Sequence, residues 1–465
     1  MARLAFLGAA RTVTGSQYVL TLPAGSIMVD CGLYQGEKSL RLLNWADPDF
    51  DVAGLKWLIL THTHLDHIGR VPRLVKQGFR GRILCTPPTR QLAELLLKDS
   101  AHLQKEDAGY FNRKGLTKHS PALPLYDEAD VEEALGLFDE VPLGQERELL
   151  PGARFAYRGA GHILGAASAD FHLQEQQRTT RIVFSGDIGR FGAVLTKDPL
   201  LAPGSVDYVV MESTYGDRLH ERADVLDELE AILQRTFDRG GVLLIPAFAV
   251  SRAQQMIYLL DQIVTSGRMR PFPIHLDSPM AVDATRIYAR FPDAHRVSLR
   301  SIGGATLLHG RWVHHHKTRK ESEALNDFRG PGVIISASGM LSGGRILHHC
   351  RVRLPRAENS LLIVGYQAAT TLGRALVDGA KVVRIHKHEV VVRAEVGQLH
   401  GLSGHADADE LMRWLSGVQD PPQCVFVTHG EEASALALAE RIRRERGFRA
   451  LVPSMHQRVD LAAQS

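Results

Sequence analysis

Apolar residues in the first two hundred positions fall into short runs separated by Gly and Pro, a pattern typical of short strands. One longer segment, Thr89–Leu103, has apolar residues at helical spacing and predicts a helix. The polar stretch 105–120 after it is expected to be flexible. The strand-type runs are Arg3–Leu7, Tyr18–Leu22, Ser26–Val29, Trp57–Leu60, Arg82–Cys85, Arg154–Tyr157, Ala167–Leu173 and Arg181–Phe184. Strands mixed with helices favour an α/β architecture of packed layers.

The pattern changes near position 206, where apolar runs alternate with amphipathic stretches such as 222–239 and 252–266. Repeated strand–helix–strand units predict a parallel sheet covered on both faces, and therefore a second domain at 208–375. Its strand-type runs are Tyr208–Met211, Val242–Ile245, Pro273–Leu276, Val333–Ser336 and Leu361–Val364. After it, the patterns predict a hairpin at 381–396, helices at 405–415 and 433–446, and a strand at 423–427.

Composition narrows the class of protein without deciding it. A chain of 465 residues with 44% hydrophobic and 23% charged residues is typical of a soluble enzyme of two or three domains. The formal net charge of +3 is too small to imply nucleic acid by itself. Four widely spaced cysteines, with no C-x-x-C spacing, suggest neither a disulfide framework nor a cysteine zinc site. No apolar run approaches the ~20 residues of a membrane span, and the expected compartment is the cytoplasm.

The strongest chemical signal is the segment Thr61-His62-Thr63-His64-Leu65-Asp66-His67, directly after an apolar run. His62 and His64 are two residues apart, so both rings point to one face of an extended segment. Asp66 and His67 follow where the chain must leave the sheet. Imidazole with carboxylate suits zinc or manganese, and the segment therefore predicts a divalent metal site.

Other metal-competent residues also stand beside Gly, shortly after a strand-type run. They are Asp30, His162, Asp187 and His429. Each alone is more often a turn or capping residue. Because the carboxyl ends of strands in open α/β sheets can converge on one crevice, we expect these residues to join the histidine segment.

These motifs resemble the metallo-β-lactamase fold and its β-CASP nuclease branch, which includes the mRNA 3′-end cleavage endonuclease. The fold is marked by Asp30, His62-x-His64-x-Asp66-His67, His162 and Asp187; the branch is marked by Glu212 in Met-Glu-Ser-Thr-Tyr-Gly-Asp-Arg, His405 in Leu-Ser-Gly-His-Ala-Asp, and His429 in Thr-His-Gly-Glu. The resemblance implies an αββα sandwich formed by residues 1–207 and 376–465. A β-CASP domain, 208–375, with a parallel sheet flanked by helices, is inserted into it.

The resemblance also implies two Zn²⁺ ions, with Mn²⁺ as an alternative, that activate a hydroxide for attack on phosphodiester bonds of single-stranded RNA. One ion would lie among His62, His64, His162 and Asp187, and the other among Asp66, His67, Asp187 and His429. Asp30 would not bind a metal itself but would fix the loop that carries the metal ligands. Glu212 and His405 would handle the proton of the leaving group. Asp66, Asp187, Glu212 and His405 are thus the expected catalytic residues.

Gly- and Ser-rich strand ends in the second domain are candidates for binding the phosphate backbone. We expect Ser336, Ser338 and Gly339 to contribute backbone N–H groups, and Arg252 and Arg374 to pair with phosphates. Such turns are more often plain connections between elements. The tracts 314–316 and 348–349 are histidine-rich, and we expect them to lie on solvated surface.

Three alternative functions remain. Hydrolysis of a small ester, thioester or lactam would use the same metals, but the inserted domain would then be unnecessary. DNA-cleaving members of the family tend to have Val where this chain has His429, which favours RNA. A non-catalytic RNA-binding subunit is disfavoured because every ligand position is filled. The choice between endonuclease and 5′-exonuclease action, the RNA target, the physiological metal and a possible homodimer stay open.

Overall fold

The computed structural model describes residues 2–175, 178–221, 224–297, 308 and 310–461. The chain folds into two compact units. Unit 1 comprises Met1–Gly192, Lys197–Leu219 and His405–Ser465, and unit 2 comprises Ala193–Thr196 and His220–Gly404. No helix in the described part of the chain has both the length and the apolar character to cross a bilayer.

Unit 1 contains two seven-stranded mixed sheets. The first has the order β22 (Gln457–Asp460), β1 (Arg3–Phe6), β2 (Tyr18–Leu22), β3 (Gly25–Val29), β4 (Leu55–Ile59), β5 (Arg82–Cys85) and β6 (Phe138–Glu140). The second has the order β21 (Ala450–Leu451), β20 (Cys424–Thr428), β11 (Tyr208–Glu212), β10 (Arg178–Phe184), β9 (Ala167–Glu175), β8 (Ala153–Gly159) and β7 (Arg147–Leu150). Strands from both ends of the chain complete each sheet.

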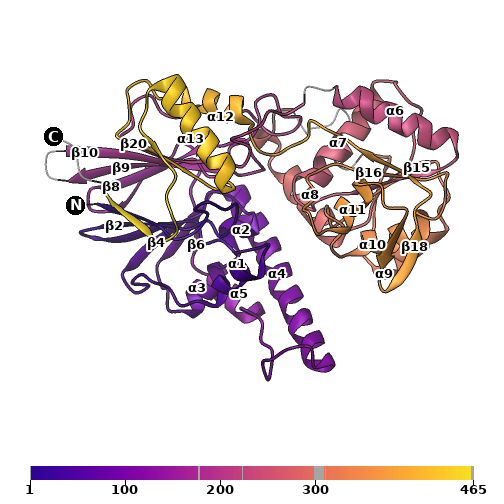
Figure 1. Cartoon of the computed structure of the whole chain (residues 1–465), viewed down its shortest axis with the longest axis horizontal. Coiled ribbons are helices and arrows are strands. Elements are labelled where there is room, and N and C mark those ends of the chain that lie inside the picture. The colour runs from indigo at the N-terminus through magenta and orange to yellow at the C-terminus, as the bar shows by residue number, and fades with distance from the viewer. Residues whose placement is uncertain (1, 176–177, 222–223, 298–307, 309, 462–465) are drawn as a thin grey trace. The chain divides into compact units, whose positions relative to one another are not determined.

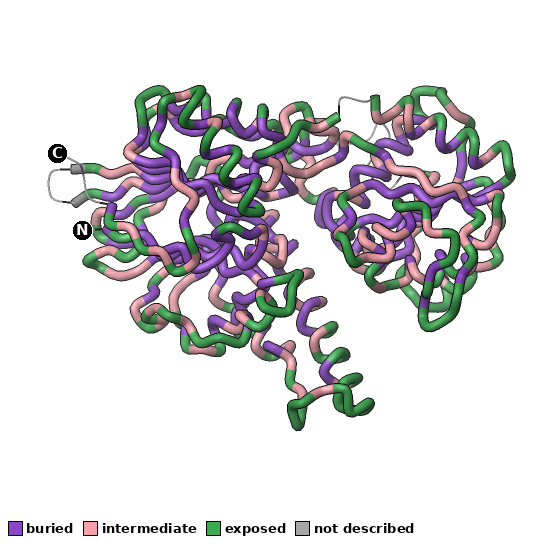
Figure 2. Tube along the Cα trace, in the orientation of Figure 1, coloured by how far each residue is buried: buried purple, intermediate pink, exposed green. Residues whose placement is uncertain are grey.

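The two sheets of unit 1 pack face to face with helices outside them (Figure 1). Buried side chains of both sheets form one core, in which the Phe6 and Phe426 rings lie 5.0 Å apart. A second apolar cluster joins the outer face of the first sheet to α3 (Val71–Lys76), α4 (Pro87–Lys114) and α5 (Glu128–Leu135). A third joins the second sheet to α12 (Ala408–Leu415) and α13 (Glu432–Arg446). The result is the αββα sandwich, with its buried strands in the middle layers (Figure 2).

Short helices complete unit 1 near the strand ends. They are α1 (Lys38–Leu42), a 3₁₀ turn (Leu43–Trp45) and α2 (Leu65–Ile68). The sheet ends that carry α2 are also the ends where the candidate metal ligands lie.

Unit 2 contains a six-stranded sheet in which every pairing is parallel. The order is β14 (Val313–His315), β13 (Ile274–Leu276), β15 (Gly332–Ser336), β12 (Val242–Pro246), β16 (Ser360–Ile363) and β19 (Glu395–Gln398). All five residues of β12 and of β15 are buried, as expected for a parallel sheet covered on both faces. The helices are α6 (Val225–Asp238), α7 (Arg252–Thr265), α8 (Pro279–Arg290), α9 (Arg319–Ala324), α10 (Arg345–Arg353) and α11 (Leu372–Val377), and short 3₁₀ turns cover Pro292–Ala294 and Leu325–Asp327. A hairpin, β17 (Val382–Ile385) with β18 (His388–Val391), lies before β19.

The main segment of unit 2, His220–Gly404, begins and ends later in the chain than the second domain predicted at 208–375. Residues 208–212 form β11, which pairs with β10 and β20 and therefore belongs to unit 1. Unit 2 continues past 375 to Gly404, because β19 adds to its sheet beside β16.

The prediction of a flexible stretch over residues 105–120 was wrong for residues 105–114, which are helical. The helix predicted over Thr89–Leu103 continues to Lys114 as α4. Thr86 caps its N-terminus and Gly115, at φ 60°, ends it in the left-handed conformation that glycine adopts readily. Polar residues such as Gln, Lys and Glu are good helix formers, so low apolar content did not end the helix.

Candidate metal centre

The candidate ligands of unit 1 lie just after the carboxyl ends of strands in both sheets. His62 and His64 follow β4, and Asp66 and His67 belong to α2, which begins immediately afterwards. From the second sheet, His162 follows β8, Asp187 follows β10 and His429 follows β20. The face-to-face packing of the sheets therefore brings together residues that are up to 367 positions apart in the chain (429 − 62).

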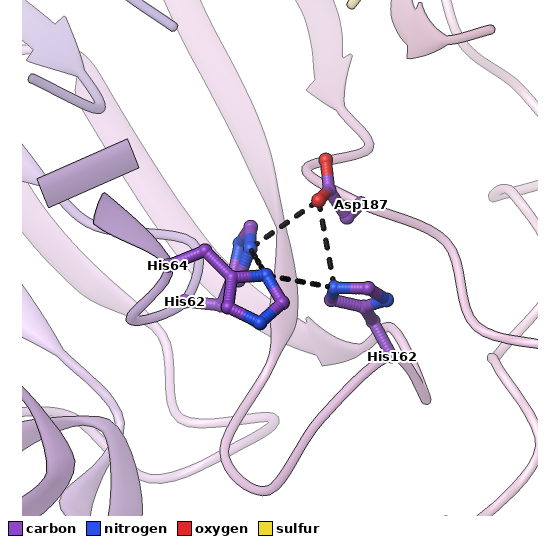
Figure 3. A group of neighbouring side chains, drawn as sticks. All are labelled: His62, His64, His162 and Asp187. Atoms are coloured by element: carbon purple, nitrogen blue, oxygen red, sulfur yellow. Dashed lines mark hydrogen bonds and ion pairs between the residues drawn. The ribbon is translucent and has the colours of Figure 1, made fainter. Parts of the chain in front are cut away.

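The first group of donors consists of His62, His64, His162 and Asp187, whose ligand atoms all lie within 4.8 Å of one another (Figure 3). The His64 Nδ1 atom lies 3.1 Å from both His62 Nε2 and His162 Nε2. The Asp187 Oδ2 atom lies 3.3 Å from His62 Nε2 and 3.5 Å from His162 Nε2. Three imidazoles and a carboxylate that converge in this way form a ligand set typical of zinc.

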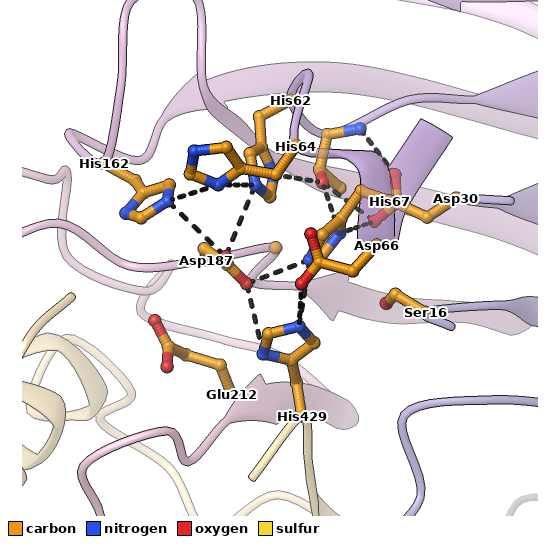
Figure 4. Close-up of polar contacts among 12 residues, drawn as sticks. Ser16, Asp30, His62, His64, Asp66, His67, His162, Asp187, Glu212 and His429 are labelled. Carbon is orange, nitrogen blue, oxygen red and sulfur yellow. Dashed lines mark hydrogen bonds and ion pairs between the residues drawn. The ribbon is translucent and has the colours of Figure 1, made fainter. Parts of the chain in front are cut away.

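The second group consists of Asp66, His67 and His429 (Figure 4). His67 Nε2 lies 3.1 Å from His429 Nε2, which in turn lies 3.4 Å from Asp66 Oδ2. Asp187 Oδ1 is 3.2 Å from His67 Nε2 and 3.4 Å from His429 Nδ1. One oxygen of Asp187 thus faces each group, which is the arrangement that a bridging carboxylate needs.

The charges in the first group match those of a metal site. Burial lowers the pKa of His62, and burial together with the neighbouring His62 lowers that of His64 to about 3. Burial and His405 lower the pKa of His162 well below its ordinary value. These rings are therefore uncharged at neutral pH, and neutral imidazole is the form that binds a metal ion. Burial would raise the pKa of Asp187, but the surrounding histidines hold it well below its ordinary value.

In the second group, burial opposes the protonation of His67 and His429, but Asp187 raises the pKa of both rings. The carboxylates of this group therefore favour a positive charge beside them. A divalent cation would supply the same positive charge, so the residues present fit such an ion.

Asp30 lies behind the ligands and is buried. Its Oδ1 accepts a hydrogen bond from Thr61 N at 2.8 Å, and its Oδ2 accepts from Thr61 Oγ1 at 2.8 Å and from His67 Nδ1 at 2.7 Å. Because a carboxylate can only accept hydrogen bonds, His67 Nδ1 must donate its proton to Asp30. The Nε2 atom of His67 is then the one that faces the other metal-binding side chains. Asp30 and His429 have φ values of 56° and 45°. Residues other than glycine rarely adopt this left-handed backbone conformation, and those that do are often found at functional sites.

A pair formed by Glu212 and His405 adjoins the metal donors. Glu212 is buried at the end of β11, where its Oε1 accepts from Ile188 N at 2.7 Å and its Oε2 from Thr214 N at 3.1 Å. His405 Nδ1 lies 3.1 Å from Glu212 Oε1 and 3.8 Å from Asp187 Oδ2. Burial opposes protonation of His405, but Glu212 and Asp187 raise its pKa to about 9. Both carboxylates thus favour the protonated form of His405.

The expected phosphate-binding residues lie in unit 2, at the ends of adjacent strands β15, β12 and β16. The Ser336 hydroxyl is buried and donates to Asp277 O at 2.8 Å, and Arg374 of α11 is paired with Asp378, the residue that follows this helix. Ser338 Oγ accepts from Ser342 N at 3.1 Å, while Gly339 O accepts from Gln367 Nε2 at 3.0 Å. Phosphate binding by this set, with Arg252, stays a prediction.

The histidine tracts of unit 2 are not all solvated surface. His349 is buried, and its Nε2 lies 2.6 Å from Asp277 Oδ2. His316 Nε2 lies 3.0 Å from His275 Nδ1, on the neighbouring strand. The sequence missed both pairs because each partner lies tens of residues away, so that only the strand pairing brings them together.

Three family models match consecutive parts of the chain. The metallo-β-lactamase superfamily matches residues 10–235, the β-CASP domain 253–376, and the Zn-dependent metallo-hydrolase RNA specificity domain 389–453. The chain is 39% identical to Ribonuclease TTHA0252 of Thermus thermophilus, over 94% of this chain and 95% of that protein. It belongs to the β-CASP branch of the metallo-β-lactamase superfamily.

Other relatives of this β-CASP protein agree with that assignment. It is 30% identical to the transcription termination factor FttA of Methanocaldococcus jannaschii, over 95% of this chain and 69% of that one. A solved structure from Enterococcus faecalis, described as a protein of unknown function, aligns with a TM-score of 0.55 at 11% identity, over 98% of this chain and 99% of the other. That likeness supports the fold alone.

Family and geometry together make the chain a metal-dependent hydrolase. The segment that matches the Zn-dependent metallo-hydrolase RNA specificity domain contains His405, which pairs with Glu212, and His429, which belongs to the second group of donors. This β-CASP protein therefore carries a metal-binding His/Asp cluster within a Zn-dependent metallo-hydrolase fold.

Proposed function

We propose that the protein is a ribonuclease that hydrolyses phosphodiester bonds of single-stranded RNA with two Zn²⁺ ions. The observation that carries this proposal is the position of Asp187, which faces both donor groups while His405 lies 3.8 Å from its Oδ2 atom. The match to an RNA specificity domain over 389–453 and the 39% identity to a ribonuclease support RNA as the substrate.

Two neighbouring divalent cations supply a water of lowered pKa and positive charge for the phosphate oxygens. His62, His64, His162 and Asp187 would hold one cation, and Asp66, His67, Asp187 and His429 the other; Mn²⁺ fits the same donors. Asp30 keeps His67 in the tautomer with a free Nε2 atom. The protein thereby supplies the preorganised charge that a phosphoryl transition state requires.

His405 is the proposed general acid. Its Nδ1 proton is held by Glu212, so its Nε2 proton is the one available for the leaving ribose oxygen. Glu212 favours the protonated ring and fixes it by accepting from Nδ1 at 3.1 Å. Glu212 is itself anchored by two backbone N–H groups, so the ring cannot turn away without breaking this network.

The test is a comparison of substrates with matched sequence. An unstructured RNA 20-mer, the same DNA sequence, the RNA duplex, and a panel of small esters and thioesters are incubated with the Zn²⁺- or Mn²⁺-loaded protein. We expect cleavage of the single-stranded RNA alone, and its loss after chelation. Faster turnover of DNA or of a small ester would overturn the proposal.

RNA carrying a 5′-phosphate, 5′-triphosphate or 5′-hydroxyl then separates the modes of action. A ladder of internal products for all three indicates an endonuclease, whereas single nucleotides released only from the 5′-phosphate form indicate a 5′-exonuclease. Light scattering of the same preparation tests whether the protein is a monomer or a homodimer.

A further inference from the structure

The far part of α4 and the segment that returns from it form an arm on unit 1, residues 100–127. Figure 1 shows α4 extending beyond the other helices of unit 1, and Figure 2 shows that its far end is exposed. The near end of α4 is hydrogen-bonded to the segment that follows His162. Thr86 Oγ1 donates to Gly165 O at 2.7 Å, three residues after His162.

The inner face of the arm is fixed by polar contacts. Asn112 donates through Nδ2 to Ala122 O at 2.9 Å and accepts through Oδ1 from Ala122 N at 2.7 Å. Gln104 Oε1 accepts from Leu125 N at 3.0 Å. Gln104 and Asn112 are eight residues apart, with the buried Ala108 between them, so all three lie on one helix face. The returning segment therefore has a defined path along the helix.

The tip of the arm also exposes two aromatic rings, and basic residues follow them in the chain. Tyr110 is 42% exposed and Phe111 41%, and their ring centroids lie 6.0 Å apart. The tip, residues 109–123, contains Arg113, Lys114 and Lys118 and no Asp or Glu. Within the described residues, no ion pair is found for these three cations, and all are exposed.

Exposed aromatic rings beside unpaired cations are the combination that binds single-stranded nucleic acid. Bases stack on the rings, while the cations track the phosphates. Leu116 and Leu123, exposed by 62% and 64%, extend the apolar surface. A partner with flat apolar faces and a negative backbone satisfies both features, whereas a purely apolar partner would leave the charges uncompensated.

We propose that this tip binds single-stranded RNA away from the bond that is cleaved, an inference that rests on the proposed ribonuclease function. From Pro87 to Phe111 the helix rises about 36 Å, at ~1.5 Å per residue. Roughly ten nucleotides span that distance at ~3.4 Å each in a stacked strand. The tip therefore contributes to the binding of long RNA and not to that of short RNA.

Two double variants test the arm. Tyr110→Ala/Phe111→Ala removes the rings, and Arg113→Gln/Lys114→Gln removes two charges. The control, Lys56→Gln/Arg154→Gln, removes two exposed charges near the starts of β4 and β8, the strand ends opposite to the metal centre. Each protein is assayed with an unstructured 24-mer and with a 6-mer that contains the same cleavage site.

For the ring variant, we expect KM for the 24-mer to rise about five-fold or more with unchanged kcat, because stacking on each ring contributes to binding. KM for the 6-mer should stay unchanged. For the charge variant, the slope of log Kd against log salt should decrease by about 1.4, since each phosphate contact on a single strand contributes ~0.7. Binding is measured by fluorescence anisotropy, and thermal unfolding checks the fold.

Equal effects on both lengths, or unchanged 24-mer binding in both variants, would overturn the arm proposal. If the wild type cleaves no RNA, the proposed function fails, yet anisotropy with the 24-mer still reports on the tip. If the tip variants instead dissociate a dimer at unchanged RNA affinity, the tip is a contact between copies of the chain and the proposal is wrong.

Discussion

Replacement of Asp30 by Asn tests whether the centre depends on a residue that touches no metal. Asp30 accepts three hydrogen bonds, at 2.7–2.8 Å, two from Thr61 and one from His67 Nδ1. In Asp30→Asn the remaining oxygen can still accept from Thr61 N. The amide group that replaces the second oxygen is a donor, and it then faces His67 Nδ1 as another donor.

The expected consequence is a change of tautomer at His67. To accept from the amide, Nδ1 must lose its proton, and the proton of the neutral ring then resides on Nε2, the atom that faces Asp187 and His429. A charge-assisted hydrogen bond is worth about 1.5–3 kcal/mol. At ~1.4 kcal/mol per tenfold, the second zinc ion should bind roughly 10- to 100-fold more weakly. The first group, which contains no contact to Asp30, should keep its affinity.

Competition titration with a fluorescent zinc chelator, together with elemental analysis of the bound metal, measures both sites. Thr61→Val is the companion variant: it removes the hydroxyl that donates to Asp30 Oδ2 and lies 3.1 Å from His62 Nδ1, so it should weaken zinc binding at both groups. Asp139→Asn, which affects the ion pairs of Asp139 with Arg82 and Arg147 away from the metal donors, is the matched control. Two zinc ions bound to Asp30→Asn with wild-type affinity would refute the reasoning, and the unfolding temperature of the metal-free variant shows whether it still folds.

Three further results are expected. His405→Ala should lower kcat on RNA by about 10²–10⁴-fold with unchanged zinc content, whereas exposed His388→Ala should not; loss of zinc instead would contradict the acid role. Chelation should lower the unfolding temperature by several degrees, because ligand at 100 times Kd adds about 2.7 kcal/mol, and an unchanged temperature would argue against a bound metal. Burial lowers the pKa of His275 to about 4. Between about pH 6.5 and 4, the His275 ring is therefore protonated in the unfolded state but not in the folded state. The free energy of unfolding should therefore decrease as the pH is lowered through that window, by about 1–2 kcal/mol after allowance for partial exposure. The decrease should be smaller in His275→Gln. An equal dependence of the unfolding free energy on pH in both proteins, measured by urea titration, would count against this.

Local sequence was sufficient for much of the fold and for the meeting of the candidate ligands. The apolar runs before His62 and Asp187 are strands, because short β-branched and apolar runs that end in Gly or polar residues leave few other structures. The convergence of their ends follows from the packing of the two sheets. The family match confirms the fold class, while the individual roles of the ligands stay predictions.

What the sequence did not show depends on long-range contacts. In the second half of α4, Asn112 and Gln104 bind the returning segment, contacts that the apolar pattern does not show. The burial of His349 depends on Asp277, which is 72 residues earlier and is placed by a different strand. The limits of the compact units depend on where strands such as β11 pair, which an apolar run alone does not specify.

The distance along the chain between His67 and His429, 362 residues, also bears on when the protein can become active during synthesis. Strand β11 lacks its neighbour β20 until the last part of the polypeptide has left the ribosome. A nascent chain that ends within unit 2 contains His62, His64, His162 and Asp187 but neither His405 nor His429. Translation must therefore pass His429 before the chain contains every side chain of the two donor groups.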